Sequence, residues 1–439
     1  MNISRRQALM SALFGAGYVG LRALATGLPA SFLLNPRRVL ADNAAAACVN
    51  KSKAQYIILA TSGSGDPINA NVPGTYDDPK IAHSADPMMK ATPLTLAGQS
   101  TMAAMPWATL LPQSVLDRSA FFHVMTNTPV HPKEPEVLQL MGSIARSEML
   151  PSVLAKQLAP CLGTVQSQPI TIGATSPSEG LVYEGQAQPI IPPLSLKATL
   201  TNPAGPLSNL QPLRDQTLAK LNDLFKSGAS SSQRAYLDSL VHSQQQVRNI
   251  RQDLLNALAS IKDNSVTSQI TAAMALIQMN VTPVVAIHIP FGGDNHHDAG
   301  LQAETTQTLA GVGAIASLMS QLAAASLQDQ VTFMSLNVFG RTLGPANTDG
   351  RQHNQNHQCS VVIGKPFRGG VIGGVGPVMG DYGALAIDSK SGKGVAGGDI
   401  APVDSLASLG KTVLAAVGVD SSVIDSTITS GKVITPALA

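Results

Sequence analysis

The feature that most constrains the fold is a strand–helix–strand pattern in the second half of the chain. Residues 282–291 (TPVVAIHIPF) and 331–339 (VTFMSLNVF) are apolar and rich in β-branched residues, which predicts two buried strands. Residues 299–326 between them have the length and composition of one long helix. A helix that joins two strands in this way is the crossover of a βαβ unit, so we expect the two strands to be parallel.

Other segments extend the same alternation along the chain. Apolar runs predict further strands at residues 55–61, 120–127, 169–175 and 359–364. Helices are predicted at residues 151–159 and 407–419, and as a pair broken near residues 228–232 at 213–261. Glycine, proline or serine dominates residues 176–206 and 369–398, which predicts loops. The alternation predicts one α/β domain built on a mostly parallel sheet.

Four polar segments are expected to meet at one edge of this sheet. In open α/β sheets, sites form just beyond the carboxyl ends of the strands. Polar segments directly follow four of the predicted strands: SGSGDP at 62–67, TPVHP at 128–132, GGDNHHD at 292–298 and FGRT at 339–342. We therefore expect these loops to form one site.

Histidine is concentrated around these loops. Five of the nine histidines lie in one window: His288, His296, His297, His353 and His357. Asp294, His296, His297 and Asp298 bring two carboxylates and two imidazoles within five residues, and zinc binds such nitrogen and oxygen ligands. The alternative for the two acids is a capping role, since carboxylates are favourable at the N-terminus of the helix that follows. Capping does not account for two adjacent histidines, so the pattern favours a metal or acid–base site.

The second histidine pair lies in GRQHNQNH, residues 350–357. Asn, Gln and Gly dominate this segment and predict a loop, although His353 and His357 would share a face if it were helical. We expect one of the two to be a metal ligand and the other to lie behind it or in solvent. His131 is a weaker candidate, and His288 is expected to be a buried, hydrogen-bonded strand residue.

Two further residues are candidates for chemistry. Arg341 follows a strand in FGRT and could hold an anionic group by a bidentate contact, or form an ion pair at the sheet edge. Ser64 in SGSGDP could be a nucleophile or a ligand, although a tight turn of this kind needs only glycine and serine.

The N-terminal segment, residues 1–41, is not expected to be part of the fold. Arg5 and Arg6 precede a modestly apolar stretch, and Val39-Leu40-Ala41 is a small-residue cleavage pattern. Paired arginines in this setting are typical of a twin-arginine export signal, which predicts a periplasmic or extracellular protein. The alternative is an uncleaved segment that associates the protein with a membrane.

Without that segment the chain is slightly acidic. Residues 1–41 hold five arginines and no acid, so the formal charge falls from +2 to −3 when they are removed. A domain without a basic face is not expected to bind nucleic acid. Cys48, Cys161 and Cys359 are odd in number and widely spaced, which argues against a disulfide framework, and Cys48 is expected to be a free thiol.

Several motifs carry a resemblance to a known family. The most specific is Phe339-Gly340-Arg341-Thr342 with the downstream Gly350-Arg351-Gln352-His353. Supporting matches are the glycine turn at 63–65, His131, Pro151-Ser152, Gly293-Asp294-Asn295-His296, Val361-Val362-Ile363-Gly364 and Gly369-Gly370. In these motifs the chain resembles a family of twin-arginine-exported bacterial proteins with a sulfatase-like domain of unknown function, a relative of the alkaline phosphatase superfamily.

The resemblance implies an alkaline-phosphatase-like, sulfatase-like three-layer α/β sandwich. Residues 42–439 would form its single domain, with residues 207–265 as a helical insertion. In that superfamily a one- or two-metal site hydrolyses esters. Here Val338 and Gln352 stand where the family motifs have acids, and Thr61 or Ser62 stands near the first-strand metal aspartate. The remaining Asp294, His296 or His297, Asp298 and His353 would furnish one site for a divalent metal, zinc being favoured.

Three functions follow as hypotheses. The first is an exported hydrolase with one metal, in which Asp294, His296 and His353 are ligands and Arg341 holds the anion of a phosphate or sulfate ester. The alternative is a non-catalytic periplasmic or envelope protein that uses the same loops for binding or assembly. A third is a redox protein with an organic cofactor, because twin-arginine export often serves such proteins.

Overall fold

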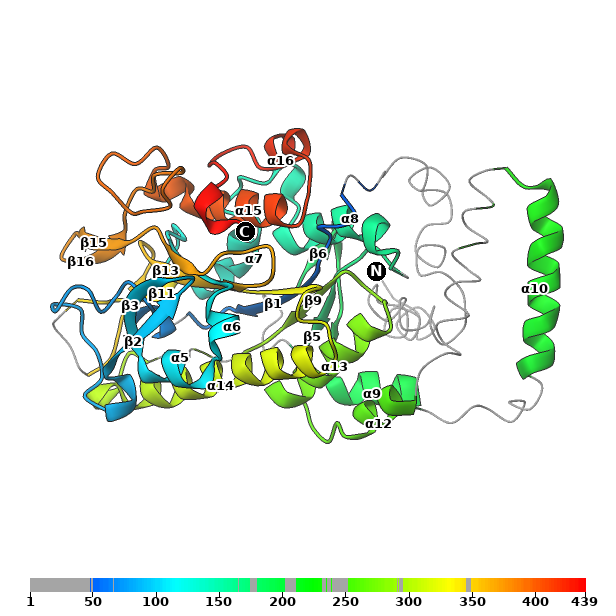
Figure 1. Cartoon of the computed structure of the whole chain (residues 1–439), viewed down its shortest axis with the longest axis horizontal. Helices are drawn as coiled ribbons and strands as arrows, with labels where there is room; N and C mark the ends of the chain where they lie inside the picture. The colour runs from blue at the N-terminus through cyan, green and yellow to red at the C-terminus, as the bar shows by residue number, and fades with distance from the viewer. Residues whose placement is uncertain are drawn as a thin grey trace, which may run out of the picture.

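A three-layer arrangement of helix, sheet and helix forms the body of the molecule (Figure 1). The structure is a computed structural model that describes residues 48, 50–65, 67–164, 166–173, 180–201, 211–230, 234, 238, 252–289, 291, 295–344 and 349–439. The export-signal prediction for residues 1–41 lies outside these residues. No helix among the described residues has the length and apolar character needed to cross a membrane.

Eight strands of the described chain form one sheet. Their order across the sheet is β14 (Gly370–Ile372), β4 (Ser119–Val124), β13 (Gln358–Ile363), β10 (Val331–Asn337), β1 (Tyr56–Ser62), β9 (Val284–Ile287), β5 (Ile170–Ile172) and β8 (Ile190–Ile191). Only β13 runs antiparallel to its neighbours, β10 and β4. The mostly parallel sheet is therefore confirmed.

The predicted βαβ unit is confirmed, with one strand inserted in its middle. The helix α14 (Gln302–Ala324) joins β9 to β10, and β1 lies between these two strands and pairs with both in parallel. Ile57 is opposite Thr332 on one side and Val284 on the other. The predicted strands at 282–291 and 331–339 are shorter than expected, because pairing covers only part of each apolar run.

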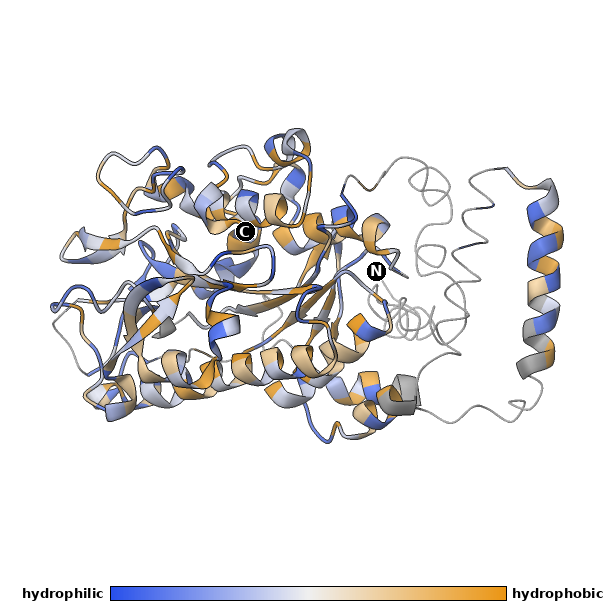
Figure 2. Cartoon of the chain, in the orientation of Figure 1, coloured by the Kyte–Doolittle hydropathy of each residue, from blue (hydrophilic) through white to orange (hydrophobic). Residues whose placement is uncertain are grey.

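The two faces of the sheet are covered by different sets of helices, as alternate strand residues require. Ile58 and Ala60 of β1 belong to one core, whereas Ile57 and Leu59 belong to the other. The helices with side chains in the first core are α5 (Met105–Leu110), α6 (Gln113–Leu116), α9 (Pro193–Thr201), α12 (Gln252–Ala259), α13 (Val266–Gln278) and α14. Those of the second are α7 (Glu134–Leu138), α8 (Leu150–Leu162), α15 (Ser405–Ala416) and α16 (Ser421–Thr427). Figure 2 shows the strands between these layers as mainly hydrophobic.

The predicted helices of residues 213–261 are found where the structure describes them. They are α10 (Gln211–Gly228) and α12, and α12 contacts α9 and α13 at the first core. In Figure 1, α10 stands apart from the body of the molecule. Leu224 and Phe225 on this helix are 69% and 65% exposed. His242, which the sequence predicts to be an ordinary residue of this helical segment, lies outside the described residues.

Two predicted loops contain regular structure instead. Residues 176–206 include β6 (Val182–Tyr183), β7 (Gln186–Ala187), β8 and α9, and residues 369–398 include β14, β15 (Val375–Val378) and β16 (Asp381–Ala384). The loop predictions were wrong because sheet pairing uses backbone groups. Gly370, for example, pairs with Ala120 without needing a side chain.

Smaller elements complete the described chain. They are β2 (Ala91–Leu96), β3 (Gln99–Ala104), β11 (Gly340–Arg341), β12 (His353–Asn354), α6 (Gln113–Leu116) and the 3₁₀ turns at Pro67–Ala70, Pro87–Met89, His131–Lys133, Ala145–Ser147, Ala299–Leu301, Pro402–Asp404 and Thr435–Ala437.

The prediction of a free Cys48 is wrong. Cys48 and Cys161 form a disulfide that spans 113 residues of sequence, and Cys359 is a buried free thiol. Wide spacing in the sequence did not exclude this pair, because the fold brings the start of the described chain to the end of α8.

Removal of this disulfide is expected to destabilise the protein. A closed loop of this size restricts the unfolded chain, so a Cys48→Ala/Cys161→Ala variant should lose about 2–4 kcal/mol of unfolding free energy. Urea denaturation of the oxidised wild type and the variant measures the difference. Reduction of the wild type should give the same loss, and equal midpoints in all three samples would contradict the prediction.

Candidate functional site

Three of the four loops expected at one sheet edge contact one another there. His131 Nδ1 lies 2.7 Å from Gly63 O, and Arg341 Nη2 donates to Ser64 O at 2.8 Å. The segment of His353 joins them, with His353 Nδ1 2.6 Å from Pro129 O, and the fourth loop reaches them through His296 and His353. Gly63 and Ser64 follow β1, Pro129 and His131 follow β4, and Arg341 follows β10. The shared edge predicted from strand order is confirmed for these loops.

Three histidines form a cluster at this edge, which we call the histidine cluster: His131, His296 and His353. His296 Nε2 lies 3.0 Å from His353 Nε2. The ring of His353 is 4.7 Å from each of the other two rings, between centroids, and 4.3 Å from the Phe339 ring. The cluster therefore brings together side chains from three loops, and the Phe339 ring packs against it.

The carbonyl contacts fix the ring tautomers. A carbonyl oxygen only accepts, so Nδ1 of both His131 and His353 must carry a proton. Nε2 of His353 is then an acceptor, and His296 Nε2 donates to it. Burial lowers the pKa of His353, and the nearby Arg341 charge acts in the same direction. A neutral imidazole with its proton on Nδ1 is the form whose Nε2 can bind a metal or remove a proton.

A two-residue pairing places Arg341 beside His353. The strands β11 and β12 are antiparallel, and Arg341 is directly opposite His353. The Arg341 side chain is buried, and its guanidinium carbon lies 5.4 Å from the Phe339 ring centroid. The fold thus places a buried cation next to the histidine cluster, which agrees with the predicted position of Arg341.

Ser64 lies in the turn that the sequence indicated. Its backbone NH donates to Ser62 Oγ at 3.2 Å, and its carbonyl accepts from Arg341. These contacts use the backbone of Ser64 and leave its role as a nucleophile a prediction.

Asp298 has the alternative role that the sequence left open. Its two carboxylate oxygens accept from the backbone NH groups of Ala303 and Glu304 at 2.8 and 2.9 Å. Both oxygens therefore satisfy the first turn of α14, as the capping alternative expects, and a role for Asp298 as a metal ligand stays a prediction. His297 is exposed, and Asp294 lies outside the described residues.

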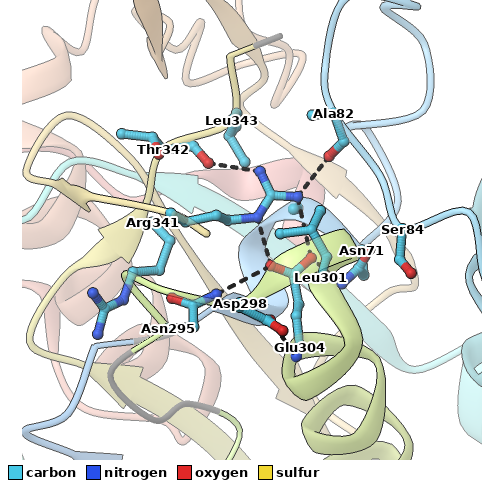
Figure 3. A network of polar contacts seen from close by, with 12 residues as sticks. Asn71, Ala82, Ser84, Asn295, Asp298, Leu301, Glu304, Arg341, Thr342 and Leu343 are labelled. Atoms are coloured by element: carbon cyan, nitrogen blue, oxygen red, sulfur yellow. Dashed lines mark hydrogen bonds and ion pairs between the residues drawn. The ribbon is translucent and has the colours of Figure 1, made fainter. Parts of the chain in front are cut away.

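The sequence reasoning missed a buried ion pair behind the cluster. Arg351 Nε lies 2.5 Å from Glu304 Oε2, and both side chains are almost fully buried. Figure 3 shows Glu304 at the centre of this polar network, with Asn71 and Asn295 beside it and the Arg341 side chain pointing away. The only signal was the position of Arg351 two residues before His353.

A second buried network involves the other histidine of GRQHNQNH. His357 Nε2 lies 2.8 Å from His123 Nδ1, His123 Nε2 lies 2.9 Å from Pro73 O, and His357 Nδ1 lies 3.1 Å from Asn69 Nδ2. Asn69 also donates to the Arg341 carbonyl at 2.9 Å. His357 therefore lies behind the site, as one of the two expectations had it, and His123 was missed because it lies inside β4. The pair helps to hold the backbone of Arg341.

These buried histidines predict a loss of stability in acid. Burial lowers the pKa of His123 to about 4 and that of His357 well below its usual range. Between pH 6.5 and pH 4 the unfolded state therefore binds more protons than the folded state. The contribution of these two histidines to the free energy of unfolding is fully present above pH 6.5 and is lost as the pH decreases. For His123 alone the loss from pH 7 to pH 4 is about 3 kcal/mol.

Urea denaturation across this pH range measures the effect. The control is a variant in which both His123 and His357 are replaced by glutamine, which should lose less stability between pH 7 and pH 4 than the wild type. Parallel stability–pH curves for the two proteins would contradict the assignment.

One buried carboxylate was also missed. Glu134, the first residue of α7, accepts a hydrogen bond from Thr61 Oγ1 at the carboxyl end of β1. His288, by contrast, is buried as expected, with its NH donating to Gln269 Oε1 at 2.8 Å.

Across the described parts of the chain, no three or more histidine, cysteine, aspartate or glutamate side chains are arranged to hold a metal ion. A cavity of about 610 Å³ lies elsewhere, at the opposite edge of the sheet, where Val115, Arg118, Met319, Val331 and Ile363 line it. The chemistry-bearing side chains are therefore not in this cavity, and we assign the candidate site to the loops.

The sequence matches no protein-family model and no curated protein. The fold and the site define the protein as a three-layer α/β protein with a histidine–arginine site at the carboxyl edge of its sheet.

Proposed function

We propose that the protein is an exported hydrolase of anionic esters, a phosphate or a sulfate, with a single divalent metal at the histidine cluster. The observation that carries the proposal is the 3.0 Å separation of His296 Nε2 and His353 Nε2, with His353 Nδ1 bound to a carbonyl. A metal-binding histidine usually donates its other ring NH to such an acceptor. The alkaline-phosphatase-like fold belongs to the same proposal.

The donor set fits a zinc ion in part. His353 would supply one nitrogen ligand through Nε2, and His296 would supply a second once its ring proton moves from Nε2 to Nδ1. Asp294 or His131 would supply a third. The carbonyl contact of His131 Nδ1 keeps a proton on that nitrogen, so Nε2 is the ring atom through which His131 would bind a metal. A bound metal would lower the pKa of a water molecule and polarise the ester.

Arg341 would hold the anionic group of the substrate. Its charge lies in a buried setting, where attraction to an anion is screened less than in water. The pairing of β11 with β12 keeps this cation at a fixed place relative to His353. Ser64 remains a candidate nucleophile beside it.

Metal analysis of the mature protein, never exposed to chelator, tests the proposal first. We expect about one equivalent of zinc or another divalent metal, and turnover of p-nitrophenyl phosphate or p-nitrophenyl sulfate. Less than a tenth of an equivalent, with no binding of added zinc and no turnover of either ester, would overturn it.

The alternative is a non-catalytic binding or assembly protein on the same scaffold. Two residues favour it: Val338 is buried and apolar, and Gln352 is exposed, at the positions where the resemblance implies acids. Ester hydrolysis by the wild type that is lost in a folded His353→Ala variant would exclude this alternative.

Export by the twin-arginine route remains part of the proposal. The Cys48–Cys161 disulfide supports it, since disulfides persist mainly in oxidising compartments. Sequencing of the mature N-terminus from a periplasmic fraction tests both export and cleavage, and an intact Met1 in the membrane fraction would favour the anchored form.

A further inference from the structure

A single buried carboxylate connects the two loops that carry His296 and His353. Glu304, in the first turn of α14, lies 2.5 Å from Arg351 Nε and 3.1 Å from Arg351 Nη2, which is a bidentate contact. Asn71 donates to the same carboxylate at 3.0 Å and Asn295 at 3.4 Å. The Glu304 carboxylate and the Arg351 guanidinium are both buried.

The guanidinium and the backbone NH of Arg351 also donate hydrogen bonds to other segments of the site. Its Nη1 donates to Thr342 O at 2.7 Å, next to Arg341, and its Nη2 donates to Ala82 O at 2.6 Å. Its backbone NH donates to Asn295 O at 2.9 Å. One guanidinium and one amide therefore tie together the segments around residues 82, 295, 342 and 351.

Two of the three cluster histidines are close neighbours of these contacts. His296 follows Asn295 directly, and His353 is two residues beyond Arg351. The two loops also touch through Gly350, where an added Cβ would lie 2.3 Å from His296 O. The positions of His296 and His353 are thus set relative to the same ion pair.

Stability alone does not account for such a pair. Burial of two charges costs desolvation, and apolar residues of similar size often stabilise a fold as well or better. The contacts instead specify one arrangement of the two loops.

We propose that Glu304 and Arg351 are positioning residues that set the distance between His296 Nε2 and His353 Nε2. The functional meaning of this inference rests on the proposed metal site, but the geometry does not. Loss of the pair should let His353 move away from Pro129 O and exchange its Nδ1–H tautomer for the more common Nε2–H form.

The test uses a Glu304→Gln/Arg351→Met double variant, which removes both charges together so that no single buried charge unfolds the protein. The matched control is Lys411→Met, which removes a buried lysine paired with the exposed Asp425 on the other face of the sheet. Imidazole ¹⁵N chemical shifts of the metal-free proteins report the tautomer of His353. Zinc titration reports affinity.

We expect wild type and Lys411→Met to show the Nδ1–H tautomer at His353 and the double variant to lose it. Zinc affinity should fall about 10–100-fold in the double variant only, as for other residues that orient metal ligands. Arg351→Lys keeps the positive charge but cannot make the bidentate contact, so its zinc affinity should lie between those of the wild type and the double variant.

An unchanged His353 tautomer in the folded double variant would overturn the inference, whatever the zinc titration shows. If the tautomer changes as expected but the wild type binds no zinc, the positioning role stands and the proposed metal function fails. If the double variant does not fold, Arg351→Lys alone decides by the same spectrum.

Discussion

Replacement of Arg351 by alanine is expected to lower the free energy of unfolding by about 3–5 kcal/mol. The substitution leaves the Glu304 carboxylate, which has no exposed surface, without its cation. It also removes the donors to Thr342 O and Ala82 O. Urea denaturation at neutral pH measures the loss.

The matched control is Arg118→Ala, the same change in a more exposed ion pair. Arg118 pairs with Asp329 at 2.6 Å, and both side chains are more than a third exposed. This variant should lose no more than about 1 kcal/mol. Similar losses in the two variants would show that burial of the Glu304–Arg351 pair does not increase its contribution to the free energy of unfolding.

The second large effect is expected at His353. Because its Nε2 is one of the two paired nitrogens, His353→Ala should reduce zinc affinity more than about 100-fold, beyond the loss usual for residues that only orient ligands. Ester hydrolysis should fall to the background rate. Isothermal titration with zinc and assays with p-nitrophenyl phosphate measure the two changes.

The control for His353 is its exposed neighbour, as Gln352→Ala, which should bind zinc like the wild type. Circular dichroism checks that both variants are folded. Unaltered zinc binding by folded His353→Ala would remove this histidine from the proposed ligand set and leave His131 and His296 to be tested.

The parts of the fold that sequence could predict are those set by local pattern. The β9–α14–β10 unit was predictable for two reasons. Apolar periodicity marks each element, and a helical crossover connection requires the two strands to be parallel. The shared edge of the four loops follows from that direction. Arg341 and His353 were therefore predictable as neighbours of the site, although their pairing across β11 and β12 was not.

What could not be predicted depends on contacts between distant parts of the chain. Glu304 and Arg351 are each ordinary charged residues in the sequence, and only folding brings them together. The residue pattern around Asp298 allowed both capping and metal binding, and only the fold shows that its carboxylate accepts from the backbone NH groups of Ala303 and Glu304. The Cys48–Cys161 pair was missed for the same reason: spacing along the chain does not report distance in space.

The one antiparallel strand has a consequence for how firmly the site is anchored. Because β13 runs against its neighbours, it begins, rather than ends, at the site edge, so the chain passes from His353 through His357 straight into an interior strand. Because β13 pairs with both β10 and β4, the end of this loop is fixed in the interior of the sheet. The loop cannot move away from the site without breaking the pairing of β13. Local opening should therefore be rarer on the His353 side than at His296, whose loop continues into the first turn of a helix.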